Sequence, residues 1–124
     1  MRKQFPFEKL DVWQDARKLV INVYECSRGF PKDERFGLTS QLTRAAVSVA
    51  NNLAEGCGRA SLKDQANYSS QAHGSLMETA SDLIIATDLG YTSETISDPI
   101  NQAYDLGIRV HNLRDSQLRR AEEL

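Results

Sequence analysis

The sequence predicts an all-α fold, an antiparallel up-down-up-down four-helix bundle, from three observations. Apolar residues recur at spacings of three and four over four long segments, which is the period of an amphipathic helix. Short stretches with glycine, proline or serine separate these segments. The four segments are similar in length, and short connections between such helices make neighbours antiparallel.

Length and composition agree with one soluble domain, residues 1–124. Hydrophobic residues make up 40% of the 124 residues and charged residues 26%, as in ordinary globular chains. The formal net charge of -2 argues against a protein whose main function is to bind nucleic acid. No apolar run resembles a signal peptide or a membrane span, so we expect a cytoplasmic protein with no membrane partner, in which Cys26 and Cys57 are reduced thiols.

The first helix is predicted at about residues 7–28. Gly29 and Pro31 follow it, and both residue types end helices. Its apolar residues form a single stripe, made of Val12, Trp13, Ala16, Leu19, Val20, Val23 and Tyr24.

The second helix is predicted at about residues 34–57, with a start between Asp33 and Leu38 and an end at Gly56 to Gly58. On a helical wheel its apolar residues gather around Leu42. We expect this group to face the bundle core: Leu38, Leu42, Ala45, Ala46, Val49 and Leu53.

The third helix is predicted at residues 62–89, with Ser61 as its N-cap and Gly90 as a left-handed stop. The fourth is predicted at residues 98–120. Asp98 would cap it and Pro99 would occupy its first turn, although Ser93 is a second candidate cap. A short turn is expected at residues 94–97.

A second stripe of small, mostly apolar residues lies about 100° from the core stripe of the second helix. Small residues let another backbone approach closely, so we interpret this stripe as a subunit interface. The alternative is that these residues are tolerated at the surface. The stripe consists of Thr43, Val47, Ala50, Ala54 and Cys57.

A polar line follows the opposite flank of the second helix, with neighbours spaced for side-chain pairing. On the third helix Ser75 and Glu78 could meet it, and Gly74 suggests close packing against another helix. We favour a hydrogen-bonded seam that fixes helix or subunit register. The alternative is a surface for an anionic or polar partner. The line consists of Gln41, Arg44, Ser48, Asn52, Glu55 and Arg59.

No motif in the sequence indicates catalysis, a cofactor or a metal. His73 and His111 lack metal-ligand spacing to other ligands. The Gly56–Arg59 segment lacks the strand and the Lys-Ser/Thr ending of a phosphate loop. We therefore expect a protein that is not an enzyme.

Motifs across nearly the whole chain resemble a bacterial four-helix-bundle family, whose founding members are encoded in intervening sequences of 23S rRNA genes. The resemblance is carried by Val12-Trp13, Phe30-Pro31, Phe36-Gly37-Leu38, Gln41-Leu42, Arg44-Ala45-Ala46, Ser48, Asn52, Ala54-Glu55-Gly56, Gly58-Arg59, Gly74-Ser75, Glu78 and Leu89-Gly90-Tyr91.

This resemblance implies a four-helix bundle that assembles with itself into rings of five subunits. The expected function is that of a homo-oligomeric assembly or scaffold protein. The alternative is an accessory protein that binds RNA, the ribosome or an RNA-associated protein. Arg44 and Arg59, with arginines near the chain ends, would then contact phosphates.

Overall fold

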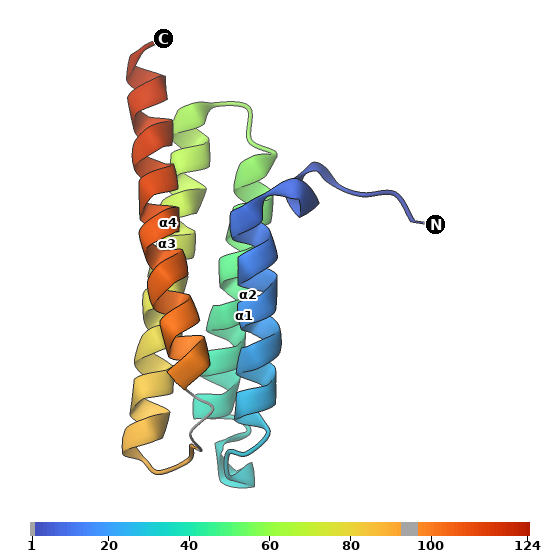
Figure 1. The fold of residues 1–124 in the computed structure, drawn as a ribbon, viewed down its shortest axis with the longest axis vertical. Helices are drawn as coiled ribbons and strands as arrows, with labels where there is room; N and C mark the ends of the chain where they lie inside the picture. Colours follow the sequence, from blue (N-terminus) through green and yellow to red (C-terminus); the bar gives the residue numbers. More distant parts are fainter. Residues whose placement is uncertain (1, 93–96) are drawn as a thin grey trace.

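The computed structural model describes residues 2–92 and 97–124, and over these residues the protein is all-α (Figure 1). Two short 3-10 helices, η1 and η2, precede the first two long helices. The elements in chain order are η1 Pro6–Lys9, α1 Asp11–Ser27, η2 Lys32–Glu34, α2 Leu38–Cys57, α3 Leu62–Asp88 and α4 Ser97–Glu122.

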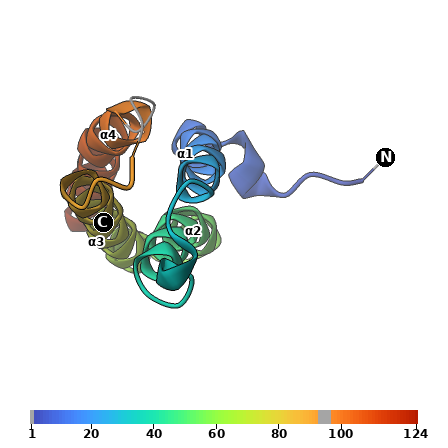
Figure 2. The ribbon, with the colours of Figure 1, turned by 90° about the horizontal axis from the view of Figure 1, so that it is seen from below.

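The four long helices pack side by side, as in a bundle (Figures 1 and 2). Helix α3 packs along both α2 and α4, and α1 packs on α2 and on α4. Seen along the bundle, α1 and α2 make one side and α3 and α4 the opposite side (Figure 2). The predicted all-α class with four helices is therefore confirmed.

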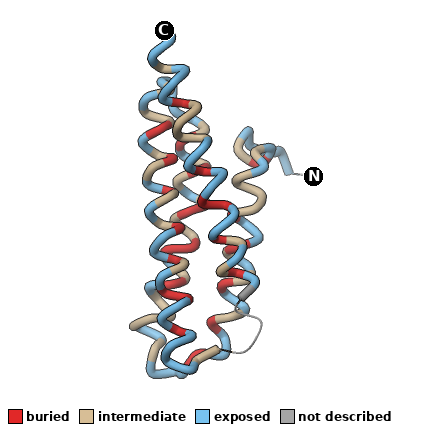
Figure 3. The backbone as a smooth tube through the Cα atoms, turned by 60° about the vertical axis from the view of Figure 1, so that its left-hand side comes forward, coloured by how far each residue is buried: buried red, intermediate tan, exposed pale blue. Residues whose placement is uncertain are grey.

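The core is built from aliphatic side chains contributed by all four helices. Leu19, Leu42, Leu76 and Val110 have no exposed surface. Burying one such side chain stabilises the fold by about 1.5–3 kcal/mol. Buried positions recur along every helix (Figure 3). The predicted core stripe of α2 is buried except for Leu38, which is half-buried and packs against the core.

The first predicted helix is in fact two elements. The prediction placed a continuous helix at residues 7–28, whereas η1 ends at Lys9 and α1 begins at Asp11. Leu10 between them has extended backbone (φ -77°, ψ 125°), which breaks the helical hydrogen-bond ladder. Pro6 opens η1, as proline does at a first helical turn.

Helix α2 begins at Leu38, the late limit of the predicted range from Asp33 to Leu38, and ends at Cys57. Gly37 has non-helical backbone angles (φ -111°, ψ -115°), and a Cβ atom there would lie 2.7 Å from Glu34 Oε1. The same oxygen accepts a hydrogen bond from the Leu38 N–H group at 3.2 Å. Glu34 therefore supports the start of α2 from outside the helix, because a helix leaves its first N–H groups without internal partners.

The predicted ends of α3 are confirmed. Ser61 Oγ accepts a hydrogen bond from the Asp64 N–H group at 3.0 Å, and Gly90 takes the left-handed conformation with φ 76°. Helix α4 starts one residue earlier than predicted, so Asp98 lies in its first turn and does not cap it. The candidate cap Ser93 and the turn at residues 94–96 lie outside the described residues.

Candidate functional site

Three residues of the predicted polar region close a hydrogen-bonded seam between α2 and α3. Ser48 Oγ lies 2.9 Å from Ser75 Oγ on α3. Asn52 donates from Nδ2 to Ser48 Oγ at 3.0 Å and to the Ser48 carbonyl at 2.9 Å. These contacts give the hydroxyls partners inside the chain, so this part of the line has the geometry of a seam.

Beside the seam lies an open groove of about 620 Å³ between α2 and α3. Arg44 is exposed and donates a hydrogen bond to Ser40 Oγ at 3.2 Å. In the described ranges no ion pair joins Arg44 to Glu78, although both line the groove. The side chains that line it are Phe36, Ser40, Gln41, Arg44, Ala45, Ser48, Ser75 and Glu78.

Glu55 and Arg59, which are neighbours on the predicted polar line, do not pair. Helix α2 ends at Cys57, so Arg59 lies in the following turn and the helical four-residue spacing no longer applies. Arg59 instead pairs with Asp64 at 3.7 Å and lies 4.6 Å from the centre of the Tyr68 ring, whose hydroxyl accepts a hydrogen bond from it. Glu55 is exposed and has no ion-pair partner within residues 2–92 and 97–124.

A buried carboxyl group on α3 was not predicted. Asp82 is only 6% exposed, and its Oδ2 atom has no hydrogen-bond partner within the described part of the chain. Burial, and then the negative charge of Glu78, raise the pKa of the Asp82 carboxyl above its usual value. The only sequence signal for this buried carboxyl group was the spacing of Glu78 and Asp82, which lie four residues apart on α3.

The small-residue stripe of α2 is half-buried along its whole length: Thr43, Val47, Ala50, Ala54 and Cys57. Ala50 packs against the core, and the Thr43 hydroxyl donates to the Thr39 carbonyl of its own helix at 2.9 Å. Cys57 lines a cavity of about 190 Å³ together with Leu10. The chain itself therefore covers part of the predicted subunit interface, and less free surface remains there than the sequence indicated.

The close helix approach predicted at Gly74 is found instead at Gly56. A Cβ atom on Gly56 would lie 2.9 Å from Tyr68 Cβ, so α2 and α3 pack tightly there. A Cβ atom on Gly74 would meet nothing within 4 Å. The prediction failed because Gly74 is exposed within the chain and faces no other helix.

Large apolar side chains gather on the outer face of α3 and α4. Met77 of α3 lies against α4, because a Cβ atom on Gly107 would be 3.3 Å from Met77 Cε. Ile84 lies two turns farther along α3, and Tyr104 and Ile108 are one turn apart on α4. These four side chains, termed the α3–α4 patch, are between 45% and 69% exposed.

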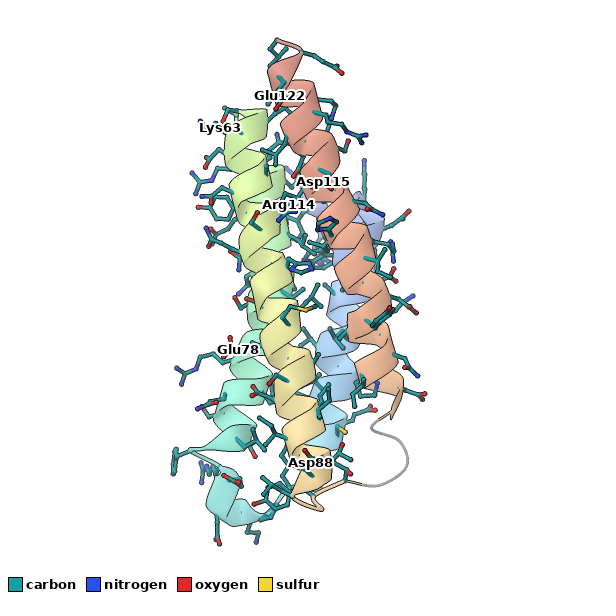
Figure 4. All side chains as sticks on the ribbon, turned by 90° about the vertical axis from the view of Figure 1, so that its left-hand side faces the viewer. Lys63, Glu78, Asp88, Arg114, Asp115 and Glu122 are labelled. Carbon is teal, nitrogen blue, oxygen red and sulfur yellow. The ribbon has the colours of Figure 1, made fainter. Side chains whose placement is uncertain are left out.

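Histidines and charged residues continue the same face. The rings of His73 and His111 are 5.9 Å apart, and His111 Nε2 lies 3.2 Å from Asp115 Oδ2. Arg114, labelled with Asp115 in Figure 4, lies 3.3 Å from the Asp115 carboxylate and 3.1 Å from His111 Nδ1. Within the described residues no group of three or more histidine, cysteine or acidic side chains could hold a metal ion.

The fold places the chain in the class of small all-α proteins with four packed helices. Within this class the chain belongs to the 23S rRNA-intervening sequence protein family, whose model matches residues 8–112. This match confirms the family that the sequence motifs resemble. A comparison with curated proteins gives no match. Over the described residues, every helix is too short or too polar to cross a membrane.

Proposed function

We propose that this protein is a non-enzymatic building block, an antiparallel up-down-up-down bundle that assembles with copies of itself into a ring of five subunits. The observation that carries the proposal is the exposed α3–α4 patch. Exposed apolar surface costs about 25 cal/mol per Å², so burying this patch against a neighbour would favour association. The ring of five rests on the family resemblance.

The half-buried stripe of α2 supports the same proposal from the other side of the bundle. Val47 keeps part of its surface free, and on α1 Ile21 and Tyr24 are exposed. A ring needs two different contact faces on each subunit, because its contacts are head-to-tail. The side formed by α1 and α2 and the side formed by α3 and α4 are different surfaces of the bundle, so each subunit has two faces for such contacts (Figure 2).

Two further observations bear on the cellular compartment and on the non-enzymatic role: the free cysteines, and the absence of catalytic motifs in the sequence. Cys26 and Cys57 are free thiols, as expected for a protein that works in the cytoplasm. The family description names no reaction, which agrees with a role in assembly.

An RNA-associated accessory role is the second candidate, and one observation favours it. Phe36 is 88% exposed at the α2–α3 groove, and the Arg35 guanidinium lies 5.3 Å from the centre of its ring. Exposed aromatic rings with nearby arginines can stack on unpaired bases. Arg44 lines the same groove and would contact phosphate.

Light scattering on the purified protein tests the first candidate. We expect a mass several times the 13.9 kDa of one chain, and a mass of one chain at all concentrations would overturn the proposal. A titration of single-stranded RNA at several salt concentrations tests the second candidate. Binding that weakens steeply with salt and is lost in Phe36→Ala would support it, whereas no binding at low salt would exclude it.

A further inference from the structure

The N-terminal arm, residues Arg2–Leu10, is ordered although it projects from the bundle beside α1 (Figures 1 and 2). Glu8 holds it in shape, since its carboxylate accepts hydrogen bonds from the Arg2 guanidinium at 2.5 and 3.1 Å and from the Phe5 N–H group at 2.6 Å. These bonds lower the pKa of Glu8 to about 2. The arm therefore keeps a defined conformation outside the core.

The ordered arm presents an aromatic ring to solvent. Phe5 is 62% exposed and stacks on Phe7 with ring centres 5.5 Å apart. Phe7 in turn contacts the edge of Trp13 on α1, with ring centres 5.0 Å apart. Ordering the arm costs conformational entropy, and the exposed ring of Phe5 buries little apolar surface in return within a single chain. A partner that covers Phe5 would recover that apolar surface.

The two halves of the chain carry opposite charge. Residues 1–60, which hold α1 and α2, contain ten basic and seven acidic residues, whereas residues 61–124 contain five basic and ten acidic residues. Their formal charges are therefore +3 and -5, although the chain as a whole is close to neutral. Residues 64–108 contain seven acidic residues and no lysine or arginine. The acidic stretch includes all four residues of the α3–α4 patch.

The arm and the α3–α4 patch complement each other but lie on opposite sides of one molecule. The arm carries Lys3 and Lys9, both exposed, beside Phe5. Asp105, which is exposed, follows Tyr104 in the sequence, and Asp88 lies at the C-terminal end of α3 (Figure 4). In Figure 2 the arm points away from α3 and α4, so the complementary surface that it can meet belongs to a second copy of the chain.

We propose that the N-terminal arm of one subunit docks on the α3–α4 patch of the next copy. Phe5 covers apolar surface around Tyr104 and Ile108, and Lys3 lies near Asp105. The inference rests on the proposed self-association and deepens it, because it names the two surfaces that meet. Each subunit uses its arm on one side and its patch on the other, so the contact is head-to-tail and can close into a ring.

Mixing two defective variants tests the pairing. Phe5→Glu disables the arm and Ile108→Glu disables the patch, and both positions are at least half exposed, so helix content measured by circular dichroism should match that of the wild type. Each variant alone should have the mass of one chain. An equimolar mixture should form a heterodimer of twice the 13.9 kDa chain mass, because one intact arm meets one intact patch.

Different failures have different meanings in this experiment. If the wild type is a single chain, the self-association fails and the arm proposal fails with it. If Phe5→Glu assembles like the wild type, self-association stands and the arm proposal is overturned. A mixture that stays at the mass of one chain also overturns the pairing.

A cross-link provides a second measurement with its own control. Phe5→Cys subunits mixed with Tyr104→Cys subunits, both in a Cys26→Ser and Cys57→Ser background, should form a disulfide-linked dimer under mild oxidation. Phe5→Cys mixed with Gln41→Cys, an exposed position in the α2–α3 groove, should form at least tenfold less. Equal yields in the two mixtures would overturn the proposal.

Discussion

Helix α3 borders two surfaces of different chemistry. On its α2 side, the Ser75 hydroxyl is paired with Ser48, and mostly polar side chains together with Phe36 line an open groove. On its α4 side, Met77 reaches α4 near Gly107, and Met77 and Ile84 stay exposed. Paired hydroxyls need no further partner, whereas exposed apolar surface is stabilised by being covered. The comparison supports the proposal that the α3–α4 patch meets a second copy of the chain, whereas the seam at Ser48 and Ser75 joins helices of one chain.

The largest effect should come from placing a charge in the patch. Ile108→Glu should abolish self-association, because burying an uncompensated carboxylate costs more than an apolar contact of about 2 kcal/mol gains. Gln41→Glu, at an exposed position in the α2–α3 groove, is the matched control and should leave the assembly intact. Light scattering measures both. If Gln41→Glu dissociates the assembly and Ile108→Glu does not, the α2–α3 groove and not the α3–α4 patch would be the contact between copies.

Removing the buried charge of Asp82 should stabilise the fold. Its folded-state pKa is raised, so the ionised form costs stability at neutral pH, and this cost disappears as the pH falls through the raised pKa towards 3.8. Asp82→Asn should raise the free energy of unfolding by about 1 kcal/mol at pH 7. Thermal unfolding should show the two proteins converging in acid. A variant less stable at pH 7 would indicate an unseen partner for the carboxylate.

The seam between α2 and α3 should show coupling. Ser48→Ala removes a partner of both Ser75 and Asn52 and should cost about 1 kcal/mol in urea unfolding. Ser48→Ala combined with Ser75→Ala should cost less than the sum of the single changes, because the two hydroxyls contact each other. If the losses in the free energy of unfolding simply add, the contact between the Ser48 and Ser75 hydroxyls contributes no stability of its own.

The arm should lose its conformation as Glu8 is protonated. The pKa of Glu8 is lowered to about 2, so its stabilising hydrogen bonds are fully present above about 4.5 and are lost as the pH falls towards 2. Trp13 is the single tryptophan and contacts Phe7, so its fluorescence should change over this range. Glu8→Gln has no carboxylate to titrate at this position, so its Trp13 fluorescence at neutral pH should already resemble that of the wild type in acid. Circular dichroism at 222 nm checks that helix content is retained.

The smallest effects are expected at the exposed ends of the polar line. Within residues 2–92 and 97–124, Arg44 donates a side-chain hydrogen bond only to Ser40 of its own helix, and Glu55 has no ion-pair partner. Arg44→Ala and Glu55→Ala should each change the free energy of unfolding by less than about 0.5 kcal/mol. If either change weakens assembly while leaving unfolding unchanged, the groove also faces a neighbouring subunit.

Local patterns predicted most of the fold. The Leu42 stripe, the Ser61 cap and the left-handed Gly90 depend on residues close in sequence, and each is found as expected. The break at Leu10 was missed, because helical periodicity does not reveal the extended backbone that separates η1 from α1. The start of α2 at Leu38 falls at the late limit of the predicted range, where Glu34 accepts a hydrogen bond from the Leu38 N–H group.

The candidate surfaces were harder to predict because they depend on how helices align. Ser48 meets Ser75 as expected, since both lie on facing helix flanks. Arg59 was misplaced because α2 ends two residues before it. The α3–α4 patch joins residues from two helices, so the spacing within one helix does not show that Met77 and Ile108 belong to one face.

Gly56 fixes how the two oppositely charged halves are joined. Because even a methyl group there would press on Tyr68, α2 and α3 meet at this end with no slack. This contact fixes how closely α2 lies against α3, and η1 packs on α1 and α2. The direction from the arm to the α3–α4 side therefore depends on packing inside one chain. If copies join head-to-tail as proposed, the angle between these two surfaces determines how many copies close a ring.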